Sequence, residues 1–328
     1  MQQSFNPYSQ TVGKIPMTVK PRSFTWEKDF ERVRAFLIET YNLTRSFQNW
    51  IPSMFENIKF GPCGTEYQDA EDAYIKLWEN GDDSEVSSIP KTAAITFLKP
   101  SGDCWIQIHP NYRSLEREIV FWIEQQRKGM KSRKAQELEV RFRVEETDEK
   151  RMALLTELGY EDLGLEEYNR IRPVDTPIPE CQLPDGFTIR HVDVEADFLQ
   201  YRRVLAAVFP HCRGMTRRLA KIYSTASFYR KDLDLVAVDS DGTFAAFCTV
   251  RIDPISRMAE FEPVGTHPDY RHLGLAKAVI CGGLHRLQKY QPSSICILGA
   301  AKSEAANRLY DSVGFTEKTE VHLWHKEI

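Results

Sequence analysis

The sequence lacks the features of several large classes of protein. No apolar run approaches the roughly 18 residues that a membrane span needs, and the polar N-terminus has no secretory pattern. Positive charge is not in excess either, because 43 Lys and Arg residues stand against 47 Asp and Glu residues and the net charge is −4. Nothing in this balance favours nucleic acid. We therefore expect a cytoplasmic protein that binds neither membranes nor nucleic acids.

Cysteine is sparse and shows no pattern. The chain has seven cysteines, which is an odd number, and no Cys-x-x-Cys motif. Scattered cysteines of this kind are typical of free thiols in a reducing compartment, and they argue against a disulfide framework or a metal site. The seven are Cys63, Cys104, Cys181, Cys212, Cys248, Cys281 and Cys296.

The length of 328 residues and the 42% hydrophobic content can supply two folded domains. The composition changes at residues 173–186, which hold four prolines and little apolar content. Such a stretch is typical of an interdomain linker. We therefore predict a flexible tail at 1–17, a first domain at 18–172 and a second domain at 187–328.

Hydrophobic periodicity predicts a similar order of elements in both domains. In the first domain, strands are expected at 18–24, 73–78, 92–98, 104–108 and 137–144, and helices at 26–41, 49–60, 115–126 and 149–158. In the second domain, strands are expected at 187–192, 234–238, 243–252, 260–266, 294–298 and 319–325, and helices at 198–209, 216–226, 277–290 and 303–313. An acidic loop at 79–85 and a solvated basic loop at 128–134 complete the first domain.

The stretch 260–276 is the most informative part of the chain, because it predicts a strand, a tight loop and the start of a helix. The first amide groups of a helix have no partner inside it, and the helix dipole is positive there. Gly274 and Ala276 are small enough for a phosphate to approach these amides, and Arg271 adds a fixed positive charge. The stretch therefore predicts a pyrophosphate cradle.

Two motifs carry a family resemblance. Arg-x-x-Gly-x-Ala at 271–276, after a strand that ends in Val-x-Thr-x-Pro, resembles the acetyl-CoA loop of the GNAT superfamily of N-acyltransferases. Residues 306–315, with the sequence Ala-Asn-Arg-Leu-Tyr-Asp-Ser-Val-Gly-Phe, resemble the second signature of the same family. The resemblance implies a mixed α/β fold of two tandem GNAT-type domains, each a mostly antiparallel twisted sheet flanked by helices. It also implies direct acyl transfer from acetyl-CoA to an amine.

The resemblance also implies roles for individual residues. Tyr310 matches the family's general acid, and Asn307 matches the residue that hydrogen-bonds the cofactor arm. The strand before the loop is expected to separate from its neighbour, so that free backbone groups at Val264, Gly265 and Thr266 pair with pantetheine. The pyrophosphate is expected to bind to the loop itself, formed by Arg271, His272, Leu273, Gly274, Leu275 and Ala276.

The general base is expected on the central strand. Glu260 and Glu262 are its two candidates, and strand alternation predicts that they share one face with Val264 and Thr266. Two nearby carboxylates would raise the pKa of one of them toward the useful range. The sequence leaves the choice between them open, with a slight preference for Glu262, and His267 is a weaker candidate.

The two domains repeat each other in sequence but not in chemistry. Residues 109–113, His-Pro-Asn-Tyr-Arg, match 267–271, His-Pro-Asp-Tyr-Arg, at an offset of 158 (267 − 109). At this offset a glutamate, Glu116, stands in place of Gly274, and at the offset of the second signature Met152 and Leu155 replace Asn307 and Tyr310. A carboxylate in the cradle would repel a pyrophosphate. The first domain is therefore predicted to be a degenerate copy.

The leading prediction is an acetyl-CoA-dependent N-acetyltransferase with an unknown small-molecule amine as acceptor and no metal. One alternative is a non-catalytic acyl-CoA sensor or scaffold, which would need the loop but neither the glutamates nor Tyr310. Another is a protein N-acetyltransferase with an open groove. No motif identifies the acceptor or the oligomeric state.

Overall fold

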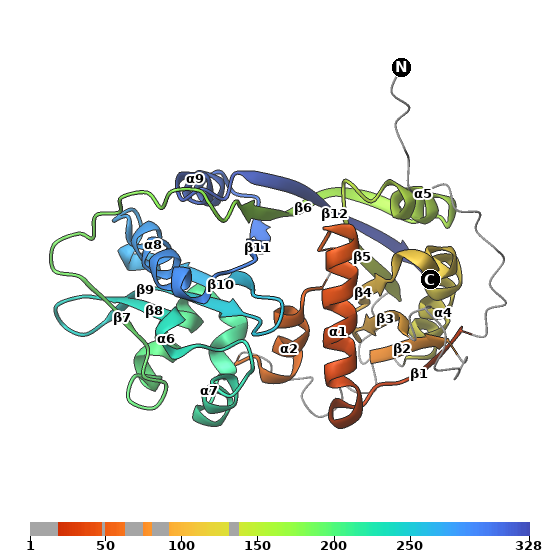
Figure 1. Cartoon of the computed structure of the whole chain (residues 1–328), viewed down its shortest axis with the longest axis horizontal. Helices are drawn as coiled ribbons and strands as arrows, with labels where there is room; N and C mark the ends of the chain where they lie inside the picture. Colours follow the sequence, from red (N-terminus) through yellow and green to blue (C-terminus); the bar gives the residue numbers. More distant parts are fainter. Residues whose placement is uncertain (1–18, 48–49, 63–74, 81–91, 131–137) are drawn as a thin grey trace, which may run out of the picture.

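The computed structural model describes residues 19–47, 50–62, 75–80, 92–130 and 138–328. Their strands form one large twisted sheet with helices on both faces (Figure 1). The expected tail at 1–17 and most of the loops expected at 79–85 and 128–134 lie outside these residues. Among the helices that the structure describes, none is both long and apolar enough to span a bilayer.

The first half of the chain has the predicted succession of elements. Strands are β1 (Val19–Ser23), β2 (Ile75–Asn80), β3 (Thr92–Leu98), β4 (Asp103–Ile108), β5 (Glu139–Glu145) and β6 (Glu161–Arg172). Helices are α1 (Trp26–Thr44), α2 (Pro52–Phe60), α4 (Glu116–Gly129) and α5 (Glu149–Glu157). Where the described residues allow the comparison, the bounds of the expected elements are confirmed to within a few residues, and β6 is the one described strand of this half that the periodicity missed.

The second half repeats this succession. Its strands are β7 (Thr188–His191), β8 (Asp234–Val238), β9 (Phe244–Ile252), β10 (Met258–Thr266), β11 (Ser294–Ala301) and β12 (Glu317–Glu327). Its helices are α6 (Phe198–Val208), α7 (Arg217–Tyr223), α8 (Leu275–Leu287) and α9 (Glu304–Ser312). Every element expected in this half is present.

Counted inward from either edge of the sheet, equivalent strands of the two halves come in the same order. The full order is β1-β2-β3-β4-β5-β12-β6-β11-β10-β9-β8-β7, so that each half exchanges its last strand with the other. β12 pairs with β5 of the first half, and β6 pairs with β11 of the second half. β6 and β12 also pair with each other, and they join the two halves along the top of Figure 1. The predicted halves therefore share one sheet instead of packing as separate sheets.

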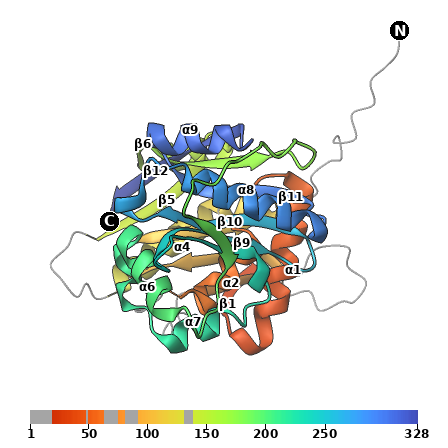
Figure 2. The ribbon, with the colours of Figure 1, turned by 90° about the vertical axis from the view of Figure 1, so that its left-hand side faces the viewer.

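Helices cover both faces of the sheet in the same way in each half. In the second half, α8 packs against one face of β8–β10, whereas α6 packs against the opposite face. In the first half, α4 occupies the position of α8, and α1 and α2 occupy the other face. Figures 1 and 2 show α1 and α2 on the side of the sheet where the two halves meet.

Buried polar contacts fasten α1 and α2 to the second half. Arg34 of α1 forms an ion pair with Asp253, with Nη2 and Oδ1 2.6 Å apart. Glu56 of α2 accepts a hydrogen bond of 2.7 Å from the Ser227 hydroxyl. A buried ion pair that loses one partner leaves an uncompensated charge, so these contacts hold the two halves in a fixed relation.

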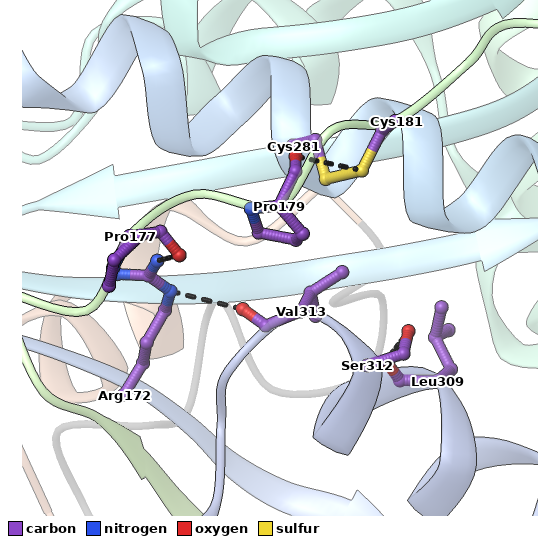
Figure 3. The surroundings of a disulfide bond; sticks show 8 residues. All are labelled: Arg172, Pro177, Pro179, Cys181, Cys281, Leu309, Ser312 and Val313. Atoms are coloured by element: carbon purple, nitrogen blue, oxygen red, sulfur yellow. Dashed lines mark hydrogen bonds between the residues drawn. A yellow bond between two sulfur atoms is a disulfide. The ribbon is translucent and has the colours of Figure 1, made fainter.

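The predicted linker is tied down along its length. Arg172, at the end of β6, donates hydrogen bonds to the carbonyls of Val313 and Pro177 (Figure 3). Further along, Cys181 forms a disulfide with Cys281 of α8 (Figure 3). Residues 173–186 therefore lie against α8 and the end of α9.

The disulfide contradicts the expectation of free thiols. Cys181 and Cys281 are 100 residues apart in sequence, and only the packing of the linker on α8 brings their Cα atoms to 6.4 Å, within the range that a disulfide requires. The prediction of a reducing compartment rested on the cysteines being free thiols, and this expectation is wrong for Cys181 and Cys281. Cys104, Cys248 and Cys296 are free, and burial raises the pKa of each of these thiols.

Candidate active site

The loop before α8 has the conformation that the sequence predicts for an anion cradle. His272 and Gly274 have φ values of 66° and 79°, in the left-handed region. Gly274 is the N-cap of α8, and a Cβ atom at this position would meet nothing within 4 Å. The amides of residues 274–277 donate to no acceptor among the described residues. The loop therefore leaves the positive end of the helix dipole open, with Arg271 exposed beside it.

The residues of this loop point in different directions. Leu275 is buried in the core beneath the loop, whereas Leu273 is 45% exposed. The side chain of Ala276 is half-buried, and His272 is exposed. The backbone, and not the side chains of Leu273 and Leu275, therefore offers donors to a ligand.

β10 and β11 separate as the family pattern implies. They pair in parallel from Met258 opposite Ser294 to Glu260 opposite Cys296, and no further. On the other side of β10, the amide of His267 donates to β9, so strand alternation aims the amides of Val264 and Thr266 toward the side that β11 has left. These two backbone positions are free to pair with an extended ligand.

One prediction about this strand is wrong. Glu260 faces α2, whereas Val264 packs into the core on the α8 face, so the two do not share a face. The register with β9 shifts between Phe261 and Val264, and this irregularity reverses the alternation. Gly265 then faces α6, where a Cβ atom would lie 2.6 Å from the ring of Phe247.

Glu260 and Glu262 have different surroundings. Glu260 is 1% exposed and accepts hydrogen bonds from Ser53 Oγ of α2 (2.9 Å) and Arg251 Nη1 (3.4 Å). Glu262 is half-buried, and no described residue donates a hydrogen bond to its carboxylate. Only Glu262 therefore presents a carboxylate that is free for a ligand.

The surroundings of Glu262 raise its pKa to about 7. Burial is the largest cause, and the negative charges of Glu260 and Glu167 act in the same direction. The positive charge of Arg251 opposes them. A carboxylate with this pKa is half-ionised near neutral pH, which suits it to accept a proton from an ammonium group.

Tyr310 lies on α9 close to Glu262. Burial, followed by the charge of Glu262, raises the pKa of the Tyr310 hydroxyl, so the phenol is protonated at neutral pH. Its ring lies 6.4 Å from the ring of Phe315 and 5.8 Å from the guanidinium of Arg170. The hydroxyl has no hydrogen-bond partner among the described residues. A carboxylate with a raised pKa and a protonated phenol are thus close enough for the charge of one to act on the other.

Asn307 is engaged in bonds within the protein. Its side-chain amide nitrogen donates to the carbonyls of Lys302 and Ser303, at 3.3 and 3.1 Å, and its oxygen accepts from Arg170. These contacts fix the first turns of α9. The structure therefore gives Asn307 a local role as well as the expected place beside Tyr310.

Sequence reasoning missed Arg170. This residue lies on β6 in the first half of the chain, and it is fully buried. It donates to Asp311 Oδ1 and to the carbonyl of Phe315, both at 2.7 Å, in addition to Asn307. Arg170 thus anchors the helix that carries Tyr310. No local motif could reveal it, because the contact depends on the exchange of β6.

The corresponding region of the first half is closed. The repeat is visible in detail, because His109 and His267 both cap a short 3₁₀ turn by accepting from the amide two residues later, at 3.2 and 3.3 Å. Beyond that turn the copies differ. Glu116, the counterpart of Gly274, is 3% exposed and forms ion pairs with Arg113 (2.8 Å) and Arg151 (2.5 Å).

A carboxylate of the protein therefore neutralises the arginine that corresponds to Arg271. Arg113 forms a second ion pair with Asp148, also at 2.8 Å. The arginine of the first half is thus already paired with two acidic side chains, whereas Arg271 has no ion-pair partner among the described residues. This difference supports the prediction that the first copy is degenerate.

Comparison with known proteins places this arrangement in a family. Residues 201–315 match the model of the Acetyltransferase (GNAT) family. This part of the chain is therefore similar to a GNAT-family domain, and it contains the loop, β10 and the whole of the second signature at 306–315.

Several relatives are mycothiol acetyltransferases. The chain is 28% identical over 149 residues to the one from Thermomonospora curvata, which corresponds to 44% of this chain and 50% of that protein. It is 29% identical over 147 residues to the one from Saccharopolyspora erythraea, covering 44% of this chain and 48% of that protein. The chain thus matches about half the length of these relatives.

Solved structures confirm the fold over nearly the whole chain. A GCN5-related N-acetyltransferase from Sphaerobacter thermophilus superposes with a TM-score of 0.64 at 17% identity, covering 96% of this chain and 97% of that one. A tandem GNAT protein from the clavulanic acid biosynthesis pathway gives 0.65 at 13% identity, covering 94% and 98%. At these identities the likeness concerns the fold, which is that of a tandem GNAT protein.

Proposed function

We propose that the protein is an acetyl-CoA-dependent N-acetyltransferase that transfers an acetyl group directly to the amine of a small acceptor. The observation that carries this proposal is the set of unpartnered groups at the opening between β10 and β11. The free amides at the start of α8 follow β10 along the chain, and Glu262 lies on β10 just beyond the point where β11 leaves it. The Tyr310 hydroxyl is close enough to Glu262 for the charge of that carboxylate to act on it. None of these groups has a hydrogen-bond partner among the described residues. The GNAT match over residues 201–315 supports the same reaction class.

The free backbone groups suit the shape of acetyl-CoA. The amides of residues 274–277 and the charge of Arg271 would hold the pyrophosphate, because both offer positive potential without a competing acceptor. The free groups of Val264 and Thr266 would pair with the pantetheine arm. One of these amides would also polarise the thioester carbonyl.

Glu262 and Tyr310 would handle the protons. An alkylammonium has a pKa near 10, so the acceptor must lose a proton before it can attack. Glu262, with a pKa of about 7, accepts that proton. Tyr310 donates its proton to the departing thiolate, and the nearby Arg170 charge favours the phenolate that this leaves behind. We assign Glu260 a different task, which is to hold Arg251 and Ser53 beside the base.

Helix α2 of the first half covers β10 beside Glu260, and this arrangement favours a small acceptor. Ser53 of α2 reaches Glu260 directly, and Glu56 of the same helix bonds Ser227. A protein acceptor would need an open groove along β10, where α2 lies instead. The mycothiol acetyltransferase relatives are consistent with a small molecule. The unpartnered Glu262 and Tyr310 argue against a sensor, which would need neither.

Calorimetric titration of acetyl-CoA into the intact chain tests the proposal, and we expect one site per chain. The first half should bind none, because Glu116 and Asp148 already pair with Arg113. Two sites would contradict the assignment of the first half as degenerate. Absence of binding would contradict the proposed function itself.

Replacement of Tyr310 with Phe should lower kcat by about 100-fold, as loss of a general acid does, and should leave the Kd for acetyl-CoA within about threefold of wild type. The phenyl ring keeps the contacts with Phe315 and with the Arg170 guanidinium, so the variant removes only the proton. Steady-state kinetics and calorimetry on the same preparation separate the two quantities. An equal loss of affinity and turnover would assign Tyr310 to packing instead.

A further inference from the structure

The candidate active site contains a second carboxylate that comes from the other half of the chain. Glu167 lies on β6, opposite Ala301 of β11 in the sheet. Its carboxylate Oε2 lies 3.3 Å from the position of a Cβ atom on Gly299. Gly299 belongs to β11, the strand that separates from β10 next to Glu262. The exchange of β6 therefore carries an acidic side chain of the first half to the opening of the second.

The side chain of Glu167 lies on the same face of the sheet as the side chain of Glu260 on β10. Its neighbour Asn169 bonds Glu145, and Ile171 packs with residues of α1, so this edge of β6 faces α1 and α2. Glu260 faces α2 as well, through Ser53. Glu167 is also close enough to Glu262 for its charge to raise the pKa of that residue. The two carboxylates thus act on each other from different strands, beside the space that β11 leaves next to β10.

Glu167 has little within the protein to balance its charge. Its side chain is 27% exposed, and its nearest cation among the described residues is Arg143, with Nε 3.9 Å from Oε2. Arg143 is itself shared with Asp103 at 3.1 Å and with Glu166 at 3.7 Å. No described residue donates a hydrogen bond to Glu167. Burial raises the pKa of Glu167, which is the sign of a carboxylate short of partners.

The charges around this space are mostly negative. Glu262 and Glu167 approach it, Glu260 is close enough to raise the pKa of Glu262, and Arg251 and Arg143 are the cations that act on these carboxylates. Arg251 is already committed to Glu260. An acceptor with one ammonium group would neutralise Glu262 and leave Glu167 half-buried and unbalanced, which is unfavourable.

We infer that Glu167 is a specificity-determining residue that binds a second cationic group of the acceptor, so that the acceptor is a small diamine or a larger molecule with a diamine-like pair of ammonium groups. This inference rests on the proposed function and adds the substrate class. Glu262 takes the proton of the reacting ammonium, and Glu167 forms an ion pair with the other. A charge-assisted hydrogen bond in a half-buried site is stronger than a neutral one, so the second group sets preference among amines.

The test compares acceptors of equal chain length. Propane-1,3-diamine, butane-1,4-diamine and pentane-1,5-diamine are each paired with the monoamine and the amino alcohol of the same length, and kcat/KM is measured with saturating acetyl-CoA. We expect at least one diamine to exceed both of its partners by about tenfold or more, the scale of one partly buried ion pair. Glu167→Gln should remove that preference, so that kcat/KM for the diamine falls by about tenfold more than kcat/KM for the monoamine of the same length.

Glu166→Gln is the matched control. Glu166 precedes Glu167 on the same strand and also approaches Arg143, but its side chain is 37% exposed. The Glu166→Gln variant removes one negative charge from β6, as Glu167→Gln does, but it leaves Glu167 in place. The diamine preference should therefore survive. Equal loss in both variants would show that net charge, and not Glu167, sets the preference, and would overturn the inference.

Other outcomes separate this inference from the proposed function. If all amines are acetylated with equal kcat/KM in wild type and in Glu167→Gln, the inference fails and the proposed function stands. If the amino alcohol equals the diamine and both depend on Glu167, the second group is a neutral donor and the cationic class is wrong. If acetyl-CoA binds but no amine is acetylated, the proposed function fails, and the inference fails with it.

Discussion

Replacing Gly274 with Glu should abolish acetyl-CoA binding while the protein stays folded. The new carboxylate would lie three residues after Arg271, the same spacing at which Glu116 forms an ion pair with Arg113 in the first half. A side chain at position 274 has open space around its Cβ atom, so it can reach Arg271 and the free amides of α8. The variant would therefore rebuild in the second half the closed arrangement of the first.

The expected size of the effect follows from charge. A fixed carboxylate beside a pyrophosphate costs several kcal/mol, so the Kd should rise by more than about 100-fold. Calorimetry measures it directly, and circular dichroism checks that the fold is intact.

Gly274→Ala and Gly274→Gln are the matched controls. All three substitutions share the strain of a left-handed residue at φ 79°, which costs about 1–2 kcal/mol. Alanine adds strain alone, and glutamine adds the bulk of the side chain without its charge. We expect Gly274→Ala to bind within about tenfold of wild type and Gly274→Gln to lie between the other two. Normal binding by Gly274→Glu would show that the loop is not the pyrophosphate site.

The loop before α8 could be predicted from sequence because its determinants are local. A strand, a proline, two small residues and a helix start lie within residues 260–276, and the structure has the helix N-cap at Gly274. The repeat was equally readable, since His109 and His267 cap equivalent turns. Local chemistry was sufficient for these features, because each depends on neighbours within a few residues.

β6 could not be predicted in this way. Six of its twelve residues are charged, and the sequence shows no alternation of apolar and polar residues. The strand is stable because it lies between β11 and β12, where Arg170 and Arg172 donate to carbonyls near the end of α9. The same long-range placement brings Glu167 to the site and Cys181 to Cys281, so the contribution of the first half was invisible in the sequence.

The irregularity in β10 decided a question that the sequence left open. Regular alternation would have made Glu260 and Glu262 equivalent in direction, as the sequence predicts. In the structure, Glu260 bonds Ser53 and Arg251, whereas Glu262 lies next to the register shift with its carboxylate free. The raised pKa of Glu262 follows from these surroundings, because burial and the negative charge of Glu260 both raise it.

Replacing Glu262 with Gln should lower kcat/KM by about 100- to 10,000-fold, the range for loss of a general base. The wild-type kcat/KM should rise with pH and level off above about pH 7, because Glu262 accepts a proton only when ionised and its pKa is raised to about 7. This rise of kcat/KM with pH, the acidic limb of the pH profile, should be absent from the profile of Glu262→Gln. Calorimetry should show acetyl-CoA affinity close to that of wild type.

Glu260→Gln is the control that assigns the base. Removing the Glu260 charge also leaves Arg251 unopposed, and both changes stabilise the ionised form of Glu262. This variant should therefore remain active, with its limb moved below pH 7. If Glu260→Gln lost the limb and Glu262→Gln kept it, the two roles would be reversed. The direction of the shift is the sharper evidence, because a purely structural loss at either position would lower the rate at every pH and leave the midpoint where it was.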